Sequence, residues 1–153
     1  MLMLRRYTCF TLCSASLLFA CAKTDQEAID TAQPASAGLT AADIAGTWDM
    51  TAVPFRGDTT PTTFVLTARA DNSGWTLTFP GRPPLPMRVT IDGDSIISQV
   101  EPYESVRRKG VKVRTNTVMR LEGGTLVGTS VARYSTTGVD SVLNFRVSGN
   151  RAR

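Results

Sequence analysis

Few residues of this chain could carry acid–base, nucleophilic or metal chemistry. Its 153 residues include no histidine and three cysteines, Cys9, Cys13 and Cys21, all near the N-terminus. The absence of histidine excludes Ser-His-Asp and Cys-His catalysis and every zinc site with histidine ligands. Because no thiol follows Cys21, residues 22–153 hold no disulfide framework and no cysteine metal site. The composition therefore favours binding over catalysis, and we expect a protein that is not an enzyme.

Two pairs of acidic residues are the remaining candidates for catalysis. Asp92 and Asp94 flank a glycine in a tight turn, where aspartate is favoured for structural reasons, and they lack the further ligands of a calcium loop. Glu101 and Glu104 could share one face of a strand, but nothing else in the sequence indicates a glycosidase. The chain has no Gly-x-Ser-x-Gly elbow and no glycine-rich phosphate or dinucleotide motif. We assign no catalytic residue, no metal and no cofactor.

Residues 1–20 have the layout of a secretory signal peptide. Arg5 and Arg6 form a basic start, and residues 7–20 follow without a charge. This stretch is too short to span a bilayer comfortably, since a spanning helix takes about 20 apolar residues. The stretch ends Leu-Phe-Ala-Cys, which resembles the lipobox of bacterial lipoproteins, although phenylalanine is less usual in its slot. The alternative is an ordinary cleaved signal peptide in which Cys21 has no role.

The resemblance to lipoproteins implies an anchor at Cys21. In that family the cysteine thiol is acylated by diacylglycerol and cleavage makes the cysteine the new N-terminus. Two or more acyl chains give stable attachment to a membrane. Ala22, not aspartate, follows the cysteine, and by resemblance to the Gram-negative sorting rule this implies the outer membrane, facing the periplasm. Loss of Arg5 and Arg6 leaves 15 basic against 13 acidic residues, so we do not expect nucleic acid as a partner.

The rest of the chain divides into a tether and one folded domain. Residues 21–38 are rich in Ala, Thr, Asp, Gln and Ser and show no apolar period, which predicts a disordered tether. Such a tether spans roughly 25 Å, enough to hold a small domain off a bilayer. Residues 39–153 have the length and the mixed composition of a single globular domain.

From residue 47 onward, apolar and polar residues alternate with the period of two that is typical of half-buried β-strands. Clusters such as Asp71-Asn72-Ser73-Gly74 mark the turns between them. Strands are expected at about residues 47–52, 64–69, 75–79, 87–92, 96–106, 112–120, 125–134 and 141–147. Pro102 implies an edge or a bulge in the fifth. No intervening helix is long enough for a parallel crossover, so the sequence predicts an all-β, eight-stranded antiparallel up-and-down barrel. A β-sandwich is the alternative, because two stacked sheets show the same alternation.

The start of the domain carries a family resemblance. Residues 44–48, Ile-Ala-Gly-Thr-Trp, resemble the Gly-x-Trp signature that opens the first strand of lipocalins and related calycin barrels. Those barrels place a short helical turn before that strand, and residues 39–44 are expected to form one. The resemblance implies that Gly46 and Trp48 close one end and that an arginine of the last strand packs on Trp48. Arg146 and Arg151 are the two candidates. The family's middle motif and its long C-terminal helix have no counterpart in this sequence.

Connections in an up-and-down barrel alternate between its two ends. Those at residues 56–61, 80–86, 107–110 and 135–140 share one end and are mostly longer than the turns at the other, which predicts a mouth there. Arg107, Arg108 and Lys109 form a basic run on this rim, and such a run would attract anionic groups. The alternative is that these are solvated turn residues.

The interior of an eight-stranded barrel has room for side chains or for one small ligand. The residues expected to line it are Trp75, Phe79, Met87, Met119 and Tyr134. Residues 128, 130 and 132 are small and would leave room if they face inward, but residues 127, 129 and 131 could equally do so. We therefore expect a lipid-anchored envelope protein that binds a small hydrophobic or anionic amphiphilic ligand, such as palmitate. The alternative is a structural or interaction module with a filled barrel, whose partner is an envelope protein.

Overall fold

The computed structural model describes residues 38–138 and 141–153. The expected signal peptide, Cys21 and residues 21–37 of the expected tether lie outside this part of the chain. The elements are α1 (Ala41–Ile44), β1 (Gly46–Pro54), β2 (Thr62–Ala68), β3 (Thr76–Thr78), β4 (Leu85–Asp92), β5 (Ser95–Glu104), β6 (Lys112–Glu122), β7 (Thr125–Tyr134) and β8 (Val142–Arg151). Among the described residues, no helix is long and apolar enough to cross a membrane.

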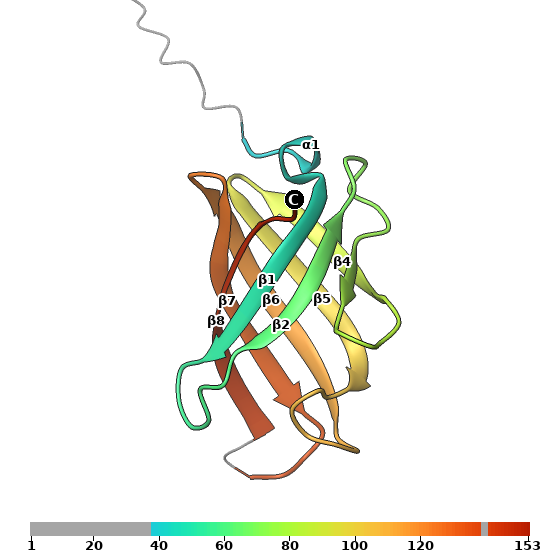
Figure 1. The fold of residues 1–153 in the computed structure, drawn as a ribbon, viewed down its shortest axis with the longest axis vertical. Helices are drawn as coiled ribbons and strands as arrows, with labels where there is room; N and C mark the ends of the chain where they lie inside the picture. The colour runs from blue at the N-terminus through green and yellow to red at the C-terminus, as the bar shows by residue number, and fades with distance from the viewer. Residues whose placement is uncertain (1–37, 139–140) are drawn as a thin grey trace, which may run out of the picture. The chain divides into compact units, whose positions relative to one another are not determined.

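The eight strands form one closed antiparallel barrel (Figure 1). Each strand pairs with the next along the chain, and β8 returns to pair with β1 from Trp48↔Arg151 to Pro54↔Phe145. This last pairing removes both free edges of the sheet. The predicted up-and-down barrel is confirmed, and the β-sandwich alternative is wrong.

The strand boundaries depart from the prediction where proline or a bulge interrupts the pairing. β3 is only Thr76–Thr78, and its register partners in β4 are Leu85 and Pro86, of which proline has no N–H to donate. In β5 the register shifts between Val100 and Tyr103, around Pro102, as the sequence predicted for a bulge. β8 extends to Arg151, four residues beyond the expected end, because β1 supplies partners along that whole length.

The inward face of β7 is the one with small residues. Ser130 and Ala132 are buried while Thr129 is exposed, so Gly128 also points to the interior. Gly128 faces Met119 of β6 in the register. A Cβ at Gly128 would lie 2.1 Å from the Val118 carbonyl oxygen, so no larger residue fits there without a backbone shift.

One end of the barrel, the floor, is packed solid. Ile44, Trp48, Leu66, Ile96 and Leu126 are all at most 1% exposed. Helix α1 covers this end (Figure 1), and the indole N–H of Trp48 donates to the Ile44 carbonyl at 2.8 Å. Such burial with a satisfied indole donor makes Trp48 a plug that holds α1 to the first strand.

An arginine completes the floor. The Arg151 guanidinium lies 4.5 Å from the centre of the Trp48 ring system and donates to the carbonyls of Ala45 and Asp43, each at 2.6 Å. Gly46 has a φ of 135°, and a Cβ there would approach the Arg151 guanidinium to 2.7 Å. Of the two candidate arginines, Arg151 therefore packs on Trp48. Arg146 does not, because strand alternation points it outward over Phe55, 5.5 Å from that ring.

Candidate ligand site at the mouth of the barrel

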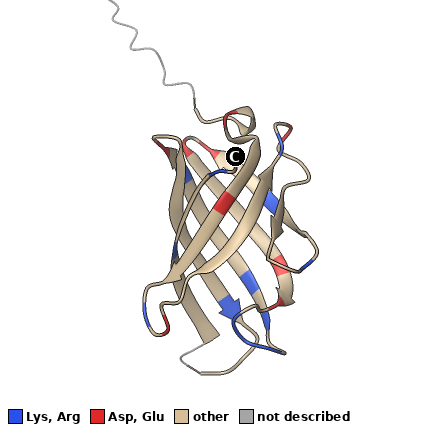
Figure 2. Ribbon diagram, in the orientation of Figure 1, with Lys and Arg blue, Asp and Glu red and all other residues tan. Residues whose placement is uncertain are grey.

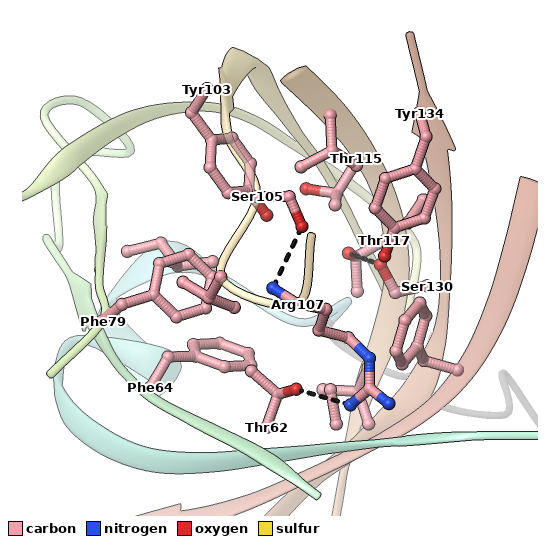
Figure 3. Close-up of a pocket in the computed structure, with 17 residues that line it drawn as sticks. Thr62, Phe64, Phe79, Tyr103, Ser105, Arg107, Thr115, Thr117, Ser130 and Tyr134 are labelled. Atoms are coloured by element: carbon pink, nitrogen blue, oxygen red, sulfur yellow. Dashed lines mark hydrogen bonds between the residues drawn. The ribbon is translucent and has the colours of Figure 1, made fainter. Parts of the chain in front are cut away.

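The opposite half of the barrel, at the mouth, contains a cavity of about 60 Å³. That volume holds about four water molecules. Typical ligand pockets measure roughly 300–1,000 Å³. An acyl chain such as palmitate does not fit the interior in this conformation. The side chains around the cavity include Phe64, Leu77, Phe79, Tyr103, Thr115, Thr117, Ser130, Tyr134 and Phe145 (Figure 3).

The sequence predicted correctly which side chains point into the barrel, but it predicted only in part how deep in the barrel each of them lies. Phe79 and Tyr134 line the cavity, but Trp75, Met87 and Met119 do not. Trp75 and Met119 are buried in the main core, and Met87 packs against that core from a half-buried position. Alternation tells which face of a strand points inward, whereas the height along the barrel decides whether a side chain meets the cavity or the packed floor.

Several lining residues were not predicted. Phe64 and Thr115 occupy inward positions in the same period-two alternation as the residues around them, so the sequence pattern could have predicted both. Tyr103 follows the bulge at Pro102. Because the register shifts there, the alternation of apolar and polar residues does not predict which way its side chain points. Burial raises the pKa of Tyr103 to about 12, against a smaller opposing effect of its hydrogen bond with Thr115. Its hydroxyl therefore stays protonated at neutral pH.

Arg107 closes the mouth over this cavity (Figure 3). One guanidinium nitrogen donates to the Thr60 carbonyl at 2.7 Å and to the Thr62 hydroxyl at 3.1 Å. The other donates to the Asp58 carbonyl at 2.8 Å and to its carboxylate at 3.0 Å. The guanidinium also lies 5.9 Å from the Phe145 ring centre. Arg107 thus reaches from the β5–β6 connection across to the β1–β2 connection, with its side chain only 15% exposed.

The β5–β6 connection is folded so that Arg107 points inward. The hydroxyl of Ser105 accepts the backbone N–H groups of Arg107 and Arg108, both at 3.0 Å. Ser105 is itself 3% exposed, and its own N–H donates to the Val111 carbonyl at 2.8 Å. A serine hydroxyl that takes two successive N–H groups fixes a tight turn. This turn aims Arg107 into the barrel.

Asp58, the acidic partner of Arg107, is held by its own turn. Thr60 donates to the Asp58 carboxylate through its hydroxyl at 2.6 Å and its backbone N–H at 3.0 Å. The hydrogen bond from the Thr60 hydroxyl, and then the one from its N–H, hold the pKa of Asp58 below its ordinary value; desolvation opposes them and the charge of Arg107 adds a smaller lowering effect. Asp58 is therefore a fully ionised carboxylate at neutral pH, exposed on the mouth.

Outside Arg107 lies a second hollow, an open mouth groove of about 500 Å³. The groove and the cavity share Thr62, Phe79, Val106 and Arg107, so these side chains separate the two spaces. Arg82 also faces the groove, and its guanidinium donates to the carbonyls of Glu104 and Ser105. The mouth groove is therefore lined by two arginines, Arg82 and Arg107, and one acidic residue, Asp58, and its excess of guanidinium groups suits an anion.

The charge is distributed unevenly between the two ends (Figure 2). The described mouth connections and the strand ends next to them hold seven basic residues and two acidic ones, Arg56, Arg82, Arg107, Arg108, Lys109, Lys112 and Arg133 against Asp58 and Glu104. The floor turns hold Asp43, Asp71, Asp92, Asp94 and Glu122 against Arg69, Arg120, Arg151 and Arg153. The mouth therefore has a positive potential that draws anions toward it.

The three residues of the predicted basic rim do not act alike. Arg107 points inward and is buried by the barrel wall, Arg108 lies with its guanidinium 4.2 Å from the Tyr134 ring centre, and Lys109 is exposed. Only Lys109 sits on the surface as a simple rim residue. The basic run lies at the mouth, and the turn at Ser105 directs Arg107 over the cavity while Lys109 stays on the surface.

The acidic pairs considered for catalysis lie away from the cavity. Asp92 and Asp94 are exposed at the floor end. Glu101 pairs with Arg88 on the outer wall, and Glu104 accepts the Gly110 N–H at 3.3 Å. Across residues 38–138 and 141–153, no three metal-ligating side chains come together. Comparison of the chain with protein-family models, with curated proteins and with solved structures gave no match.

Proposed function

We propose that this protein is a lipid-anchored protein of the bacterial envelope whose barrel binds a small amphiphile with an anionic head, without catalysis. The observation that carries the proposal is Arg107, which lies between an apolar-walled cavity and a basic groove. An arginine in this position can contact both the anionic head and the apolar part of such a ligand. The anionic head occupies the mouth groove and the apolar part enters the cavity.

The ionic partner of Arg107 is one that a ligand can replace. The Asp58 side chain is 71% exposed, so water can solvate its charge when it leaves Arg107. The Arg107 side chain is only 15% exposed, and a ligand carboxylate in the place of Asp58 would keep its charge paired. Arg82 adds a second donor on the same groove.

The size of the cavity limits the ligand. About 60 Å³ accommodates a few non-hydrogen atoms, so the barrel favours short chains unless Arg107 and its turn move outward. The same small volume also favours a second candidate function. In that alternative the barrel is a filled scaffold, and the protein acts through its outer surface on an envelope partner.

A titration with short alkyl carboxylates tests the proposal. Hexanoate is added to the folded domain and binding is followed by calorimetry and by amide chemical shifts, with hexanol as the uncharged comparison. We expect hexanoate to bind and Arg107→Gln to weaken it about tenfold or more. Arg114→Gln is the matched control, because Arg114 is exposed on the outer face of β6. Equal binding by the Arg107 and Arg114 variants, or no binding at all, contradicts the proposal and favours the filled scaffold.

The anchor needs a separate test. We expect the full chain, expressed in a Gram-negative bacterium, to incorporate labelled palmitate and to fractionate with the outer membrane. Cys21→Ser should abolish the label and release the protein. Label retained in that variant, or a reactive thiol in the processed protein, contradicts the assignment of Cys21.

A further inference from the structure

A row of hydroxyl groups crosses the inner wall below Arg107. Ser98 of β5, Thr117 of β6 and Ser130 of β7 are register partners in three consecutive strands. The next inward residues toward the floor, Met119 and Gly128, are not among those that line the cavity. Thr117 and Ser130 therefore form the deep end of the cavity, opposite its Arg107 end (Figure 3).

The hydrogen-bond pattern of this row leaves acceptors facing the cavity. Thr117 donates its hydroxyl proton to Ser130 at 2.7 Å. Ser130 in turn donates to the Asn116 carbonyl at 3.4 Å. A hydroxyl has one proton and two lone pairs. Both protons are used, so what Thr117 and Ser130 still offer is acceptor capacity, which suits a ligand group that donates.

The third member of the row is unsatisfied. Ser98 is 1% exposed, and its hydroxyl is the buried side-chain polar atom without a hydrogen-bond partner among the described residues. A buried hydroxyl without a partner is unfavourable, because it has given up its hydrogen bonds to water. Ser98 does not line the cavity, so the polar surface that meets a chain end is made by the spare lone pairs of Thr117 and Ser130, with the unpaired Ser98 hydroxyl beside Thr117 in the register.

We propose that this hydroxyl row recognises a hydroxyl group at the inner end of the ligand, so that the ligand class is a short hydroxycarboxylate. The proposal rests on the proposed function, since it takes Arg107 and the mouth groove as the site of the anionic head. The few carbon atoms between the two polar groups lie against the aromatic side chains of the cavity. An unsubstituted alkyl chain would leave the row unpaired behind a methyl group.

Two ligands of equal size separate this proposal from simple amphiphile binding. Pentanoate and 4-hydroxybutanoate have the same number of non-hydrogen atoms, and a terminal methyl in one replaces a hydroxyl in the other. A third, 3-methoxypropanoate, carries an ether oxygen that accepts but does not donate. We expect 4-hydroxybutanoate to bind about fivefold more tightly than either, because a site that pairs a hydroxyl discriminates against analogues without it.

Variants of the row provide the second arm. Thr117→Val with Ser130→Ala keeps the cavity shape and removes both acceptors, and we expect it to reverse the preference in favour of pentanoate. Thr129→Val is the matched control, since Thr129 neighbours Ser130 in β7 but is exposed on the outer face. Ser130→Ala alone serves if the double variant does not fold, as judged by thermal unfolding.

The outcomes are distinct. If pentanoate binds as well as 4-hydroxybutanoate and Arg107→Gln still weakens both, the hydroxyl row has no part in recognition and the proposed function stands. If 4-hydroxybutanoate is preferred but the double variant keeps that preference, the hydroxyl is recognised elsewhere and the inference is overturned. If neither ligand binds, the inference and the proposed function both fail.

Discussion

The guanidinium of Arg107 and the carboxylate of Asp58 meet at 3.0 Å across the mouth of the barrel, joining two connections that are 49 residues apart in the chain. Under the proposed function, this pair is the contact that a ligand anion would displace. Asp58 would then compete with the ligand for the same donor, so its charge would lower the apparent affinity.

Asp58→Asn should increase the affinity for a short carboxylate. The change removes the competing charge while it keeps the size of the side chain, so Arg107 becomes more available to the ligand. We expect about a threefold increase in hexanoate affinity, because the competing Asp58 carboxylate is itself largely exposed to water. Asp71→Asn is the control, because Asp71 accepts hydrogen bonds from Ser73 in a similar turn at the floor end. An unchanged or lower affinity in Asp58→Asn contradicts the role given to the pair.

Tyr103 should make the stability of the domain fall at high pH. Burial raises its pKa in the folded protein to about 12 from an ordinary 10. The protonated hydroxyl thus stabilises the fold fully below pH 10, and that contribution is lost as pH rises from 10 through 12, because only the unfolded chain ionises freely there. Urea unfolding at stepwise pH measures the effect. Tyr103→Phe should flatten the loss over this range, and an equally steep loss in that variant would count against the assignment.

Arg151→Met should destabilise the domain markedly. It removes two hydrogen bonds from a charged donor and the contact with the Trp48 ring, which together predict a loss of about 2–3 kcal/mol in the free energy of unfolding. Trp48 fluorescence should report a loosened floor at the same time. Arg146→Met is the matched control on the same strand. Since Arg146 contacts only the exposed ring of Phe55 among the interactions found, we expect its loss to stay within about 0.5 kcal/mol. Similar losses in both variants would sink this assignment.

Gly128→Ala should be as disruptive as a much larger core substitution. The added Cβ would lie 2.1 Å from the Val118 carbonyl oxygen and 2.7 Å from the Met119 Cα, so the backbones of β6 and β7 must separate. We expect a loss of about 2 kcal/mol or more, measured as a lower midpoint of thermal unfolding. Thr129→Ala, at the next and outward position, should change the midpoint little. A Gly128→Ala protein as stable as the parent would show that β6 and β7 are less tightly paired.

The sequence by itself determined the strands, their inward faces and most of the turns. Period-two alternation identifies the buried face because successive Cβ atoms point to opposite sides of a strand. The inward positions of Trp48, Phe79 and Tyr134 follow from it directly. The turn chemistry and the absence of a crossover helix then left an up-and-down arrangement as the simplest one for eight strands.

Only the tertiary structure decided that the barrel closes, how deep each inward side chain lies and which residues form the site. Whether β8 pairs with β1 depends on contacts about 100 residues apart in sequence, which no local pattern encodes. Height in the barrel decided that Met119 fills the floor while Thr117, two residues earlier, meets the cavity. The sequence predicted Arg107 as a charged residue on the rim, because its neighbours in sequence are basic. The turn capped by Ser105 points it inward instead, and its partners on the β1–β2 connection are distant in sequence and adjacent only once the barrel closes.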